Sequence, residues 1–163
     1  MRYGFLSFIL LLISTIPLAY AQEGIFLIRH AEQMYDVEDP PLTEDGFGRA
    51  KTWATVFRDA DIKMIYTSKK MRTKQTGEVI AEELNIPLQE VSRRDINGLV
   101  DQIRKEHADD LVLIVSHSKI LPKILKAFAP FGEYPTIKPD DYDNLFIVVP
   151  KGEAEPTVIR LRY

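Results

Sequence analysis

Residues 111–118 read LVLIVSHS, so five consecutive apolar residues are followed directly by polar ones. An unbroken apolar run of this length is typical of a central strand covered on both faces. Two further runs, at residues 24–29 (GIFLIR) and 64–67 (MIYT), also end at polar side chains, His30 and Ser68. The sequence therefore predicts buried strands that each deliver polar groups to the loop that follows.

Helix-forming segments separate these runs. Thr43, Ser68 and Asp95 each stand where the side chain could cap the N-terminus of a helix. Helices are expected at residues 43–60, 69–85, 95–107 and 119–128. Further strands are expected at residues 88–92, 145–149 and 157–161, the last two after a proline-bearing loop at residues 129–143.

Strands that alternate with helices predict an α/β fold, with three α/β/α layers and a mostly parallel central sheet. In such sheets, ligands collect at the carboxyl ends of the strands. Arg29 and His30 follow the first strand, Arg72 follows the second, and His117 and Ser118 follow the central one. The unusual polar residues are therefore expected at one edge of the sheet.

The N-terminal segment has a different composition. An almost unbroken apolar run at residues 5–18 leads into Ala-Tyr-Ala at residues 19–21, a pattern that signal peptidases cut. We predict that residues 1–21 are a signal peptide and that residues 22–163 form one domain. That domain would be exported, either periplasmic or secreted, with no membrane attachment after cleavage. The alternative is an uncleaved anchor, but a bilayer core needs about 20 apolar residues.

The overall composition excludes several classes of function. The chain is 45% hydrophobic and 28% charged, as expected for one globular domain. Its net charge of −3 gives no reason to expect a nucleic-acid partner. With no cysteine, it can form no disulfide, no thiolate metal site and no cysteine nucleophile.

Two histidines and two arginines at the predicted sheet edge would form a concentrated positive site. The planar donor fork of arginine suits phosphate oxygens, and the expected helix after His117 would add backbone N–H groups. The same set is a poor metal site, because it lacks the carboxylates that complete a charge-balanced shell. His107 lies in a charged stretch and is expected to be a solvated helix residue.

Four segments, in order, resemble the motifs of the histidine phosphatase (phosphoglycerate mutase-like) superfamily. They are LIRHAEQ at residues 27–33, PLTEDGFGRA at 41–50, YTSKKMRTKQTGEVIA at 66–81 and VSHSK at 115–119. The resemblance covers residues 24–126 and includes Arg29, His30, Arg72 and His117. Ala31 departs from it, because many members have glycine there.

The resemblance implies a phosphoglycerate mutase-like fold and a phosphohistidine intermediate on His30. Arg29, Arg72 and His117 would bind the phosphoryl oxygens, with Ser118 as a further substrate contact. Water would complete the hydrolysis, and no metal or organic cofactor is expected. The substrate would be a phosphorylated small molecule or a phosphopeptide.

The proton donor for the leaving group is the least defined part of the predicted site. Family members usually place an acid near the end of the third strand, where this sequence offers Glu90 and Asp95. Asp95 is preferred, although it is also well explained as a helix N-cap. Asp141 or Asp143 could lie near the site mouth, although a solvated loop also accounts for them.

Three functions follow from these residues. The leading one is a phosphomonoester hydrolase. The second is a non-catalytic phosphate- or phosphoprotein-binding module that has lost the acid. A phosphomutase is a weaker third, because the chain has little material between Arg72 and His117 for a cap that excludes water.

Overall fold

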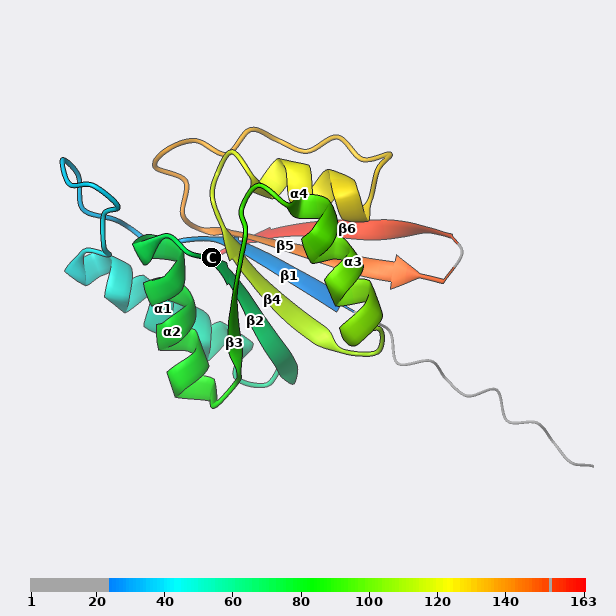
Figure 1. Ribbon diagram of the computed structural model, residues 1–163, viewed down its shortest axis with the longest axis horizontal. Helices are drawn as coiled ribbons and strands as arrows, with labels where there is room; N and C mark the ends of the chain where they lie inside the picture. Colours follow the sequence, from blue (N-terminus) through cyan, green and yellow to red (C-terminus); the bar gives the residue numbers. More distant parts are fainter. Residues whose placement is uncertain (1–23, 153) are drawn as a thin grey trace, which may run out of the picture.

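A computed structural model describes residues 24–152 and 154–163, so the predicted signal peptide lies outside the described residues. The strands are β1 (Gly24–Arg29), β2 (Ile62–Ser68), β3 (Leu88–Val91), β4 (Leu111–Ser116), β5 (Asn144–Lys151) and β6 (Ala154–Arg162). The helices are α1 (Glu44–Phe57), α2 (Met71–Leu84), α3 (Ile96–Glu106) and α4 (Leu121–Phe128). All six strands join one sheet in the order β3-β2-β4-β1-β5-β6 (Figure 1). None of the described helices is both long and apolar enough to cross a membrane.

Two hydrophobic clusters cover the two faces of the sheet. On one face, α1 and α2 bury Trp53 and Ile80 against apolar strand residues such as Ile65. On the other face, α3 and α4 bury Ile103 and Leu125 among a second set of strand residues. Figure 1 shows the two helix pairs on opposite sides of the sheet. The expected three-layer α/β/α arrangement is confirmed, and β4 is the central strand buried on both faces.

Strand direction divides the sheet into two parts. The four strands β1 to β4 are mutually parallel, whereas β5 runs antiparallel to β1 and β6 antiparallel to β5. A short turn with Gly152 at φ 59° joins β5 to β6, and a turn of that length can connect only antiparallel strands. The mostly parallel sheet is therefore right for the four strands whose ends carry the predicted site.

Several element ends match the prediction and others do not. Thr43 caps α1 by accepting from the Gly46 N–H at 3.1 Å, and Asp95 caps α3 by accepting from the Gly98 N–H at 2.9 Å. Ser68 is not the cap of α2: that helix begins at Met71 and its N-cap is Lys70. The Ser68 side chain instead bonds to other side chains, as described below.

His107 is also placed differently from the prediction. It ends α3 as the C-cap residue, and its Nδ1 lies 2.8 Å from an oxygen of Asp110. Its ring packs edge-on against Tyr66, with the ring centroids 5.9 Å apart. His107 is therefore half-buried rather than solvated, because its ring packs against Tyr66 of β2.

Candidate active site

The register of β1 and β4 places the two predicted histidines next to each other. Arg29 lies level with Ser116, and the backbone N–H of His30 donates to the Ser116 carbonyl oxygen at 2.9 Å. His30 and His117 are the next residues on the two neighbouring strands. Their rings meet edge-on with centroids 5.5 Å apart.

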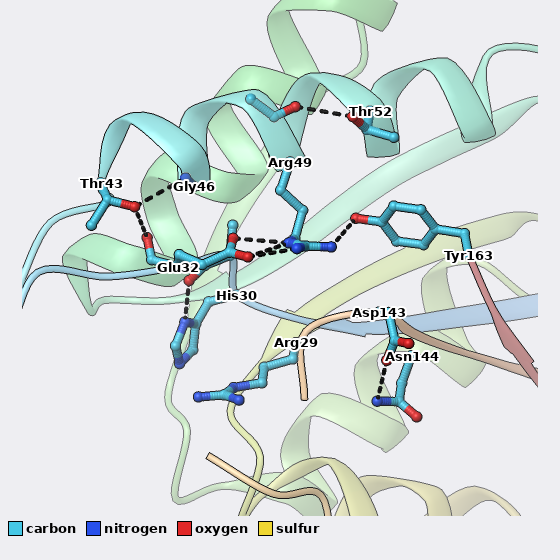
Figure 2. Close-up of polar contacts among 12 residues, drawn as sticks. Arg29, His30, Glu32, Thr43, Gly46, Arg49, Thr52, Asp143, Asn144 and Tyr163 are labelled. Carbon is cyan, nitrogen blue, oxygen red and sulfur yellow. Dashed lines mark hydrogen bonds and ion pairs between the residues drawn. The ribbon is translucent and has the colours of Figure 1, made fainter. Parts of the chain in front are cut away.

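The His30 ring is held in one tautomer. Its Nδ1 lies 2.8 Å from the Ala31 carbonyl oxygen (Figure 2), which can only accept, so Nδ1 carries the proton and Nε2 keeps its lone pair. Burial, with 4% of the residue exposed, lowers the pKa of His30 to about 3, assisted by the positive charges of Arg29 and Arg72. The imidazole is therefore neutral at pH 7 and can act as a nucleophile.

The loop that carries His30 is fixed from two sides. The Ala31 N–H donates to Oγ1 of Thr76 on α2 at 3.0 Å. On the other side, the Arg49 side chain binds both carboxylate oxygens of Glu32, with Nε at 2.6 and 2.8 Å (Figure 2). The two contacts anchor the segment after β1 to both helices on that face of the sheet.

His117 is oriented by a hydroxyl group. Its Nε2 lies 2.9 Å from Oγ of Ser68, which in turn lies 2.7 Å from Oγ1 of Thr73. Burial lowers the pKa of His117 to about 4, assisted by the positive charges of Arg72 and Arg93. Both imidazoles are therefore neutral at pH 7.

The two arginines complete a group that we call the histidine–arginine cluster: Arg29, His30, Arg72 and His117. Nη1 of Arg29 donates to the carbonyl oxygens of Lys138 and Pro139 at 3.0 and 2.8 Å. Its guanidinium also stacks over the Tyr142 ring, 4.0 Å from the centroid. The loop before β5 therefore aligns Arg29 in the cluster.

Arg72 enters the cluster from the first turn of α2. Its nearest acidic partner is Asp39, whose Oδ1 lies 3.8 Å from Nη1 of Arg72. Burial lowers the pKa of both guanidiniums from their usual value. Both nevertheless stay protonated, because arginine keeps its charge in proteins.

Three buried polar atoms of the cluster have no hydrogen-bond partner among the described residues: Nε of Arg29, Nε of Arg72 and Nδ1 of His117. Buried polar groups are normally paired, and a set left unpaired at one place needs an explanation. A small anion with several acceptor oxygens would provide one. Among the described residues, no group of three histidine, cysteine or acidic side chains could hold a metal ion.

The predicted acids are all engaged with partners outside the cluster. The exposed Asp95 caps α3, as the alternative interpretation of this residue expected, and no hydrogen bond among the described residues joins it to either imidazole. Glu90 pairs with Lys74 at 2.9 Å, and Asp141 and Asp143 both pair with Arg162. Ser118 lies half-buried in the turn after His117. The structure brings together the four cluster residues, but it adds none of these acids to them.

Some residues of the site were not predicted. Tyr142 stacks on Arg29, and its ring centroid lies 6.1 Å from that of His30. The sequence does offer a signal for Tyr142: it is the one aromatic residue in the acidic stretch DDYDNL, where an apolar ring is expected to pack against another part of the protein. The position of Ser68 in the sequence predicts a helix cap, and nothing in the sequence pairs it with His117.

The fold resembles solved structures over most of its length. The protein histidine phosphatase SixA complexed with tungstate has a TM-score of 0.73 and 18% identity, with 85% of this chain and 96% of that chain covered. YhfR of Bacillus stearothermophilus has a TM-score of 0.69 and 18% identity, covering 83% and 95% of the two chains. The mycobacterial glucosyl-3-phosphoglycerate phosphatase Rv2419c has a TM-score of 0.69 and 12% identity, covering 87% and 98%. At these identities the likeness establishes the fold alone.

Part of the sequence also matches a known family. A profile of the histidine phosphatase superfamily (branch 1) matches residues 25–97, which include Arg29, His30 and Arg72. The matched segment is similar to that superfamily and ends before His117. Among curated proteins, a probable phosphatase of Schizosaccharomyces pombe is 37% identical over 70 residues. That match covers 38% of this chain and 25% of the yeast protein, so the chain spans a small part of that relative.

Proposed function

We propose that this protein hydrolyses phosphomonoesters through a phosphohistidine on His30, without a metal ion or an organic cofactor. The observation that carries the proposal is the state of His30. It is a neutral ring with Nδ1 fixed on Ala31 and Nε2 free to attack, beside the buried Arg29 and the half-buried Arg72. A nucleophile without a proton next to an anion site is what in-line phosphoryl transfer requires.

The chemistry balances with one water molecule. The Nε2 lone pair forms a P–N bond while the P–O bond to the leaving group breaks. Arg29, Arg72 and His117 stabilise the charge on the three equatorial oxygens throughout. The leaving oxygen takes its proton from solvent. Water then forms a P–O bond as the P–N bond breaks and returns one proton to solvent, so the products are an alcohol and inorganic phosphate, and His30 returns to its neutral form.

The site lacks an evident proton donor for the leaving oxygen among the predicted acids. The four predicted carboxylates are tied to a helix cap or to basic side chains. A general acid commonly contributes about 10²- to 10⁴-fold to a rate. We therefore expect aryl phosphates, whose leaving groups need little proton assistance, to be hydrolysed much faster than alkyl phosphates.

The relatives support a phosphatase and leave the substrate open. One structural neighbour is named as a protein histidine phosphatase and another as a glucosyl-3-phosphoglycerate phosphatase. The first is complexed with tungstate, a tetrahedral oxyanion like phosphate. Both a phosphopeptide and a phosphorylated small molecule are compatible with the cluster.

An aryl phosphate assay tests the proposal, because this substrate does not depend on the missing acid. The purified protein is expected to turn it over in the presence of EDTA, and His30→Ala should abolish turnover. His107→Gln is the matched control, since that histidine lies at the end of α3 away from the cluster. Turnover that needs added metal, or that survives His30→Ala, contradicts the proposal.

A second candidate function is favoured because the four predicted carboxylates are bound to other partners. Without a proton donor, the fold could serve as a phosphate- or phosphoprotein-binding module. A phosphohistidine that forms on His30 and persists without steady release of phosphate would favour this module over the hydrolase.

We also propose, from the sequence alone, that residues 1–21 direct export and are removed after Ala21. Expression of the full chain followed by N-terminal sequencing of the exported product tests this. A mature chain that begins at Gln22 supports it, and retention of residue 1 on protein in the membrane fraction contradicts it.

A further inference from the structure

A groove of about 270 Å³ opens beside the histidine–arginine cluster, between the end of β2 and the turn that follows β3. Four basic side chains line it: Lys69, Lys70, Arg93 and Arg94. We call it the basic groove. No aspartate or glutamate is among its lining residues. A cavity with four cations and no lining acid attracts anions.

The groove shares lining residues with a second hollow, and one of its lining residues contacts the cluster. Arg93 and Arg94 also line a neighbouring cavity of about 350 Å³, which Lys123 of α4 joins. On the inner side, the groove reaches Ser68, whose hydroxyl lies 2.9 Å from Nε2 of His117. The positive charge of Arg93 is close enough to contribute to the lowered pKa values of both His117 and Arg72.

Ion pairs within the protein do not explain why these four basic residues lie together. Of the four, Lys70 alone has an acidic partner among the described residues: Asp39, 3.6 Å from its Nζ. Arg93 and Arg94 are exposed on the turn between β3 and α3. Among the described residues, the guanidiniums of these two arginines form no ion pair. Their charges repel the other cations of the site, which lowers the stability of the folded protein.

We propose that the basic groove is a subsite for a second anionic group, phosphate or carboxylate, on the ligand whose phosphoryl group binds at His30. The inference rests on the proposed function for the first phosphate and narrows the substrate to molecules with two anionic groups. Arg93 and Arg94 are the specificity residues, since an arginine fork fits either a phosphate or a carboxylate. Such a ligand could be a small bisphosphorylated metabolite or a phosphopeptide with acidic neighbours.

Binding of stable phosphonates tests the subsite without relying on turnover. Calorimetry on the purified full chain would compare alkane bisphosphonates of increasing length with alkyl monophosphonates of equal length. We expect one bisphosphonate to bind about tenfold more tightly than its matched monophosphonate, as for one or two exposed charge-assisted contacts. The length that binds best reports the distance between the two anion sites.

Two double variants identify the residues responsible. In Arg93→Gln/Arg94→Gln, the preference for the bisphosphonate should fall about tenfold, to near equality. Arg104→Gln/Lys105→Gln removes the same charge from the exposed last turn of α3 and should keep the preference. Equal binding of the two phosphonates by the wild type, or equal loss in both variants, would overturn the proposal.

A second pair of ligands separates the two sources of the second anion. A phosphopeptide with flanking aspartates is compared with the same peptide carrying asparagines. A preference for the acidic peptide that is lost in Arg93→Gln/Arg94→Gln assigns the groove to phosphopeptides, whereas a preference confined to bisphosphonates assigns it to small molecules. Because binding is measured without catalysis, failure of aryl phosphate hydrolysis would refute the hydrolase and leave this test intact.

Discussion

At the scale of single residues, the charge states of two imidazoles govern what the site can do. His30 and His117 lie among fixed positive charges, and burial together with those charges keeps both neutral at pH 7. A protonated His30 could not attack phosphorus, because Nε2 would have no lone pair. The arginines therefore have two effects: they attract the phosphate and they keep the nucleophile unprotonated.

Ser68 is a positioning residue for His117, and its removal provides a residue-scale prediction. Ser68→Ala deletes the hydroxyl that bonds Nε2 of His117, so kcat for an aryl phosphate should fall about tenfold, the value of one buried hydrogen bond. The ¹⁵N resonances of the His117 ring should shift in the same variant, which a purely structural loss would not require.

The control for this prediction is Thr52→Ala. The Thr52 hydroxyl bonds the Gly48 carbonyl oxygen at 3.1 Å on the exposed face of α1, and it is remote from both imidazoles. This variant should leave kcat and the His117 resonances unchanged. An equal fall in kcat in both variants would rule out a positioning role for Ser68.

At the scale of elements, the start of α1 supports the loop that carries His30. A Cβ atom at Gly46 would lie 2.2 Å from the carbonyl oxygen of Glu32, which is backbone and cannot move aside freely. Gly46→Ala should therefore lower the free energy of unfolding by about 2 kcal/mol, within the range for overpacking, and should also lower kcat. Urea unfolding and the aryl phosphate assay measure the two effects.

Gly48 on the same helix is the matched control. A Cβ there meets nothing within 4 Å, and alanine is favoured over glycine in a helix by up to about 1 kcal/mol. Gly48→Ala should therefore stabilise the protein slightly and leave kcat unchanged. If Gly46→Ala behaved like Gly48→Ala, the close contact between α1 and the Glu32 backbone would be disproved.

The elements also show what a single sequence can predict. Apolar runs located β1, β2 and β4, because a strand covered on both faces must be apolar throughout. The cap preferences of Thr43 and Asp95 fixed the starts of α1 and α3 within a residue. The antiparallel direction of β5 was not predicted, because its side-chain pattern is the same in either direction and the preceding loop is long enough to allow both.

At the scale of the whole molecule, the parallel part of the sheet explains why the cluster could be predicted. Arg29, His30, Arg72 and His117 follow strands whose carboxyl ends must share one edge, so their convergence needs no knowledge of side-chain contacts. The partners of Ser68 and Tyr142 could not be predicted in this way. They depend on rotamers and on the path of the loop at residues 129–143, which local sequence patterns do not encode.

The neutral imidazoles make the stability of the whole molecule depend on pH. Below about pH 6.5, unfolded histidines take up protons, whereas in the folded protein His30 and His117 do so only near pH 3 and 4. The unfolded state therefore binds more protons in this window, and the free energy of unfolding must fall as the pH falls. Each imidazole should contribute about 2 kcal/mol of this loss between pH 6.5 and pH 5.

Urea unfolding at pH 7 and at pH 5 measures this loss of unfolding free energy. Ordinary carboxyl groups take up protons mainly below this range, so they contribute little to the difference. His117→Asn removes one of the two groups, so the difference in unfolding free energy between the two pH values should shrink by about half. An unchanged difference in that variant would mean that His117 takes up its proton equally in the folded and unfolded chains. In that case the cluster would not hold its second imidazole neutral, and the charge balance proposed for phosphoryl transfer would be wrong.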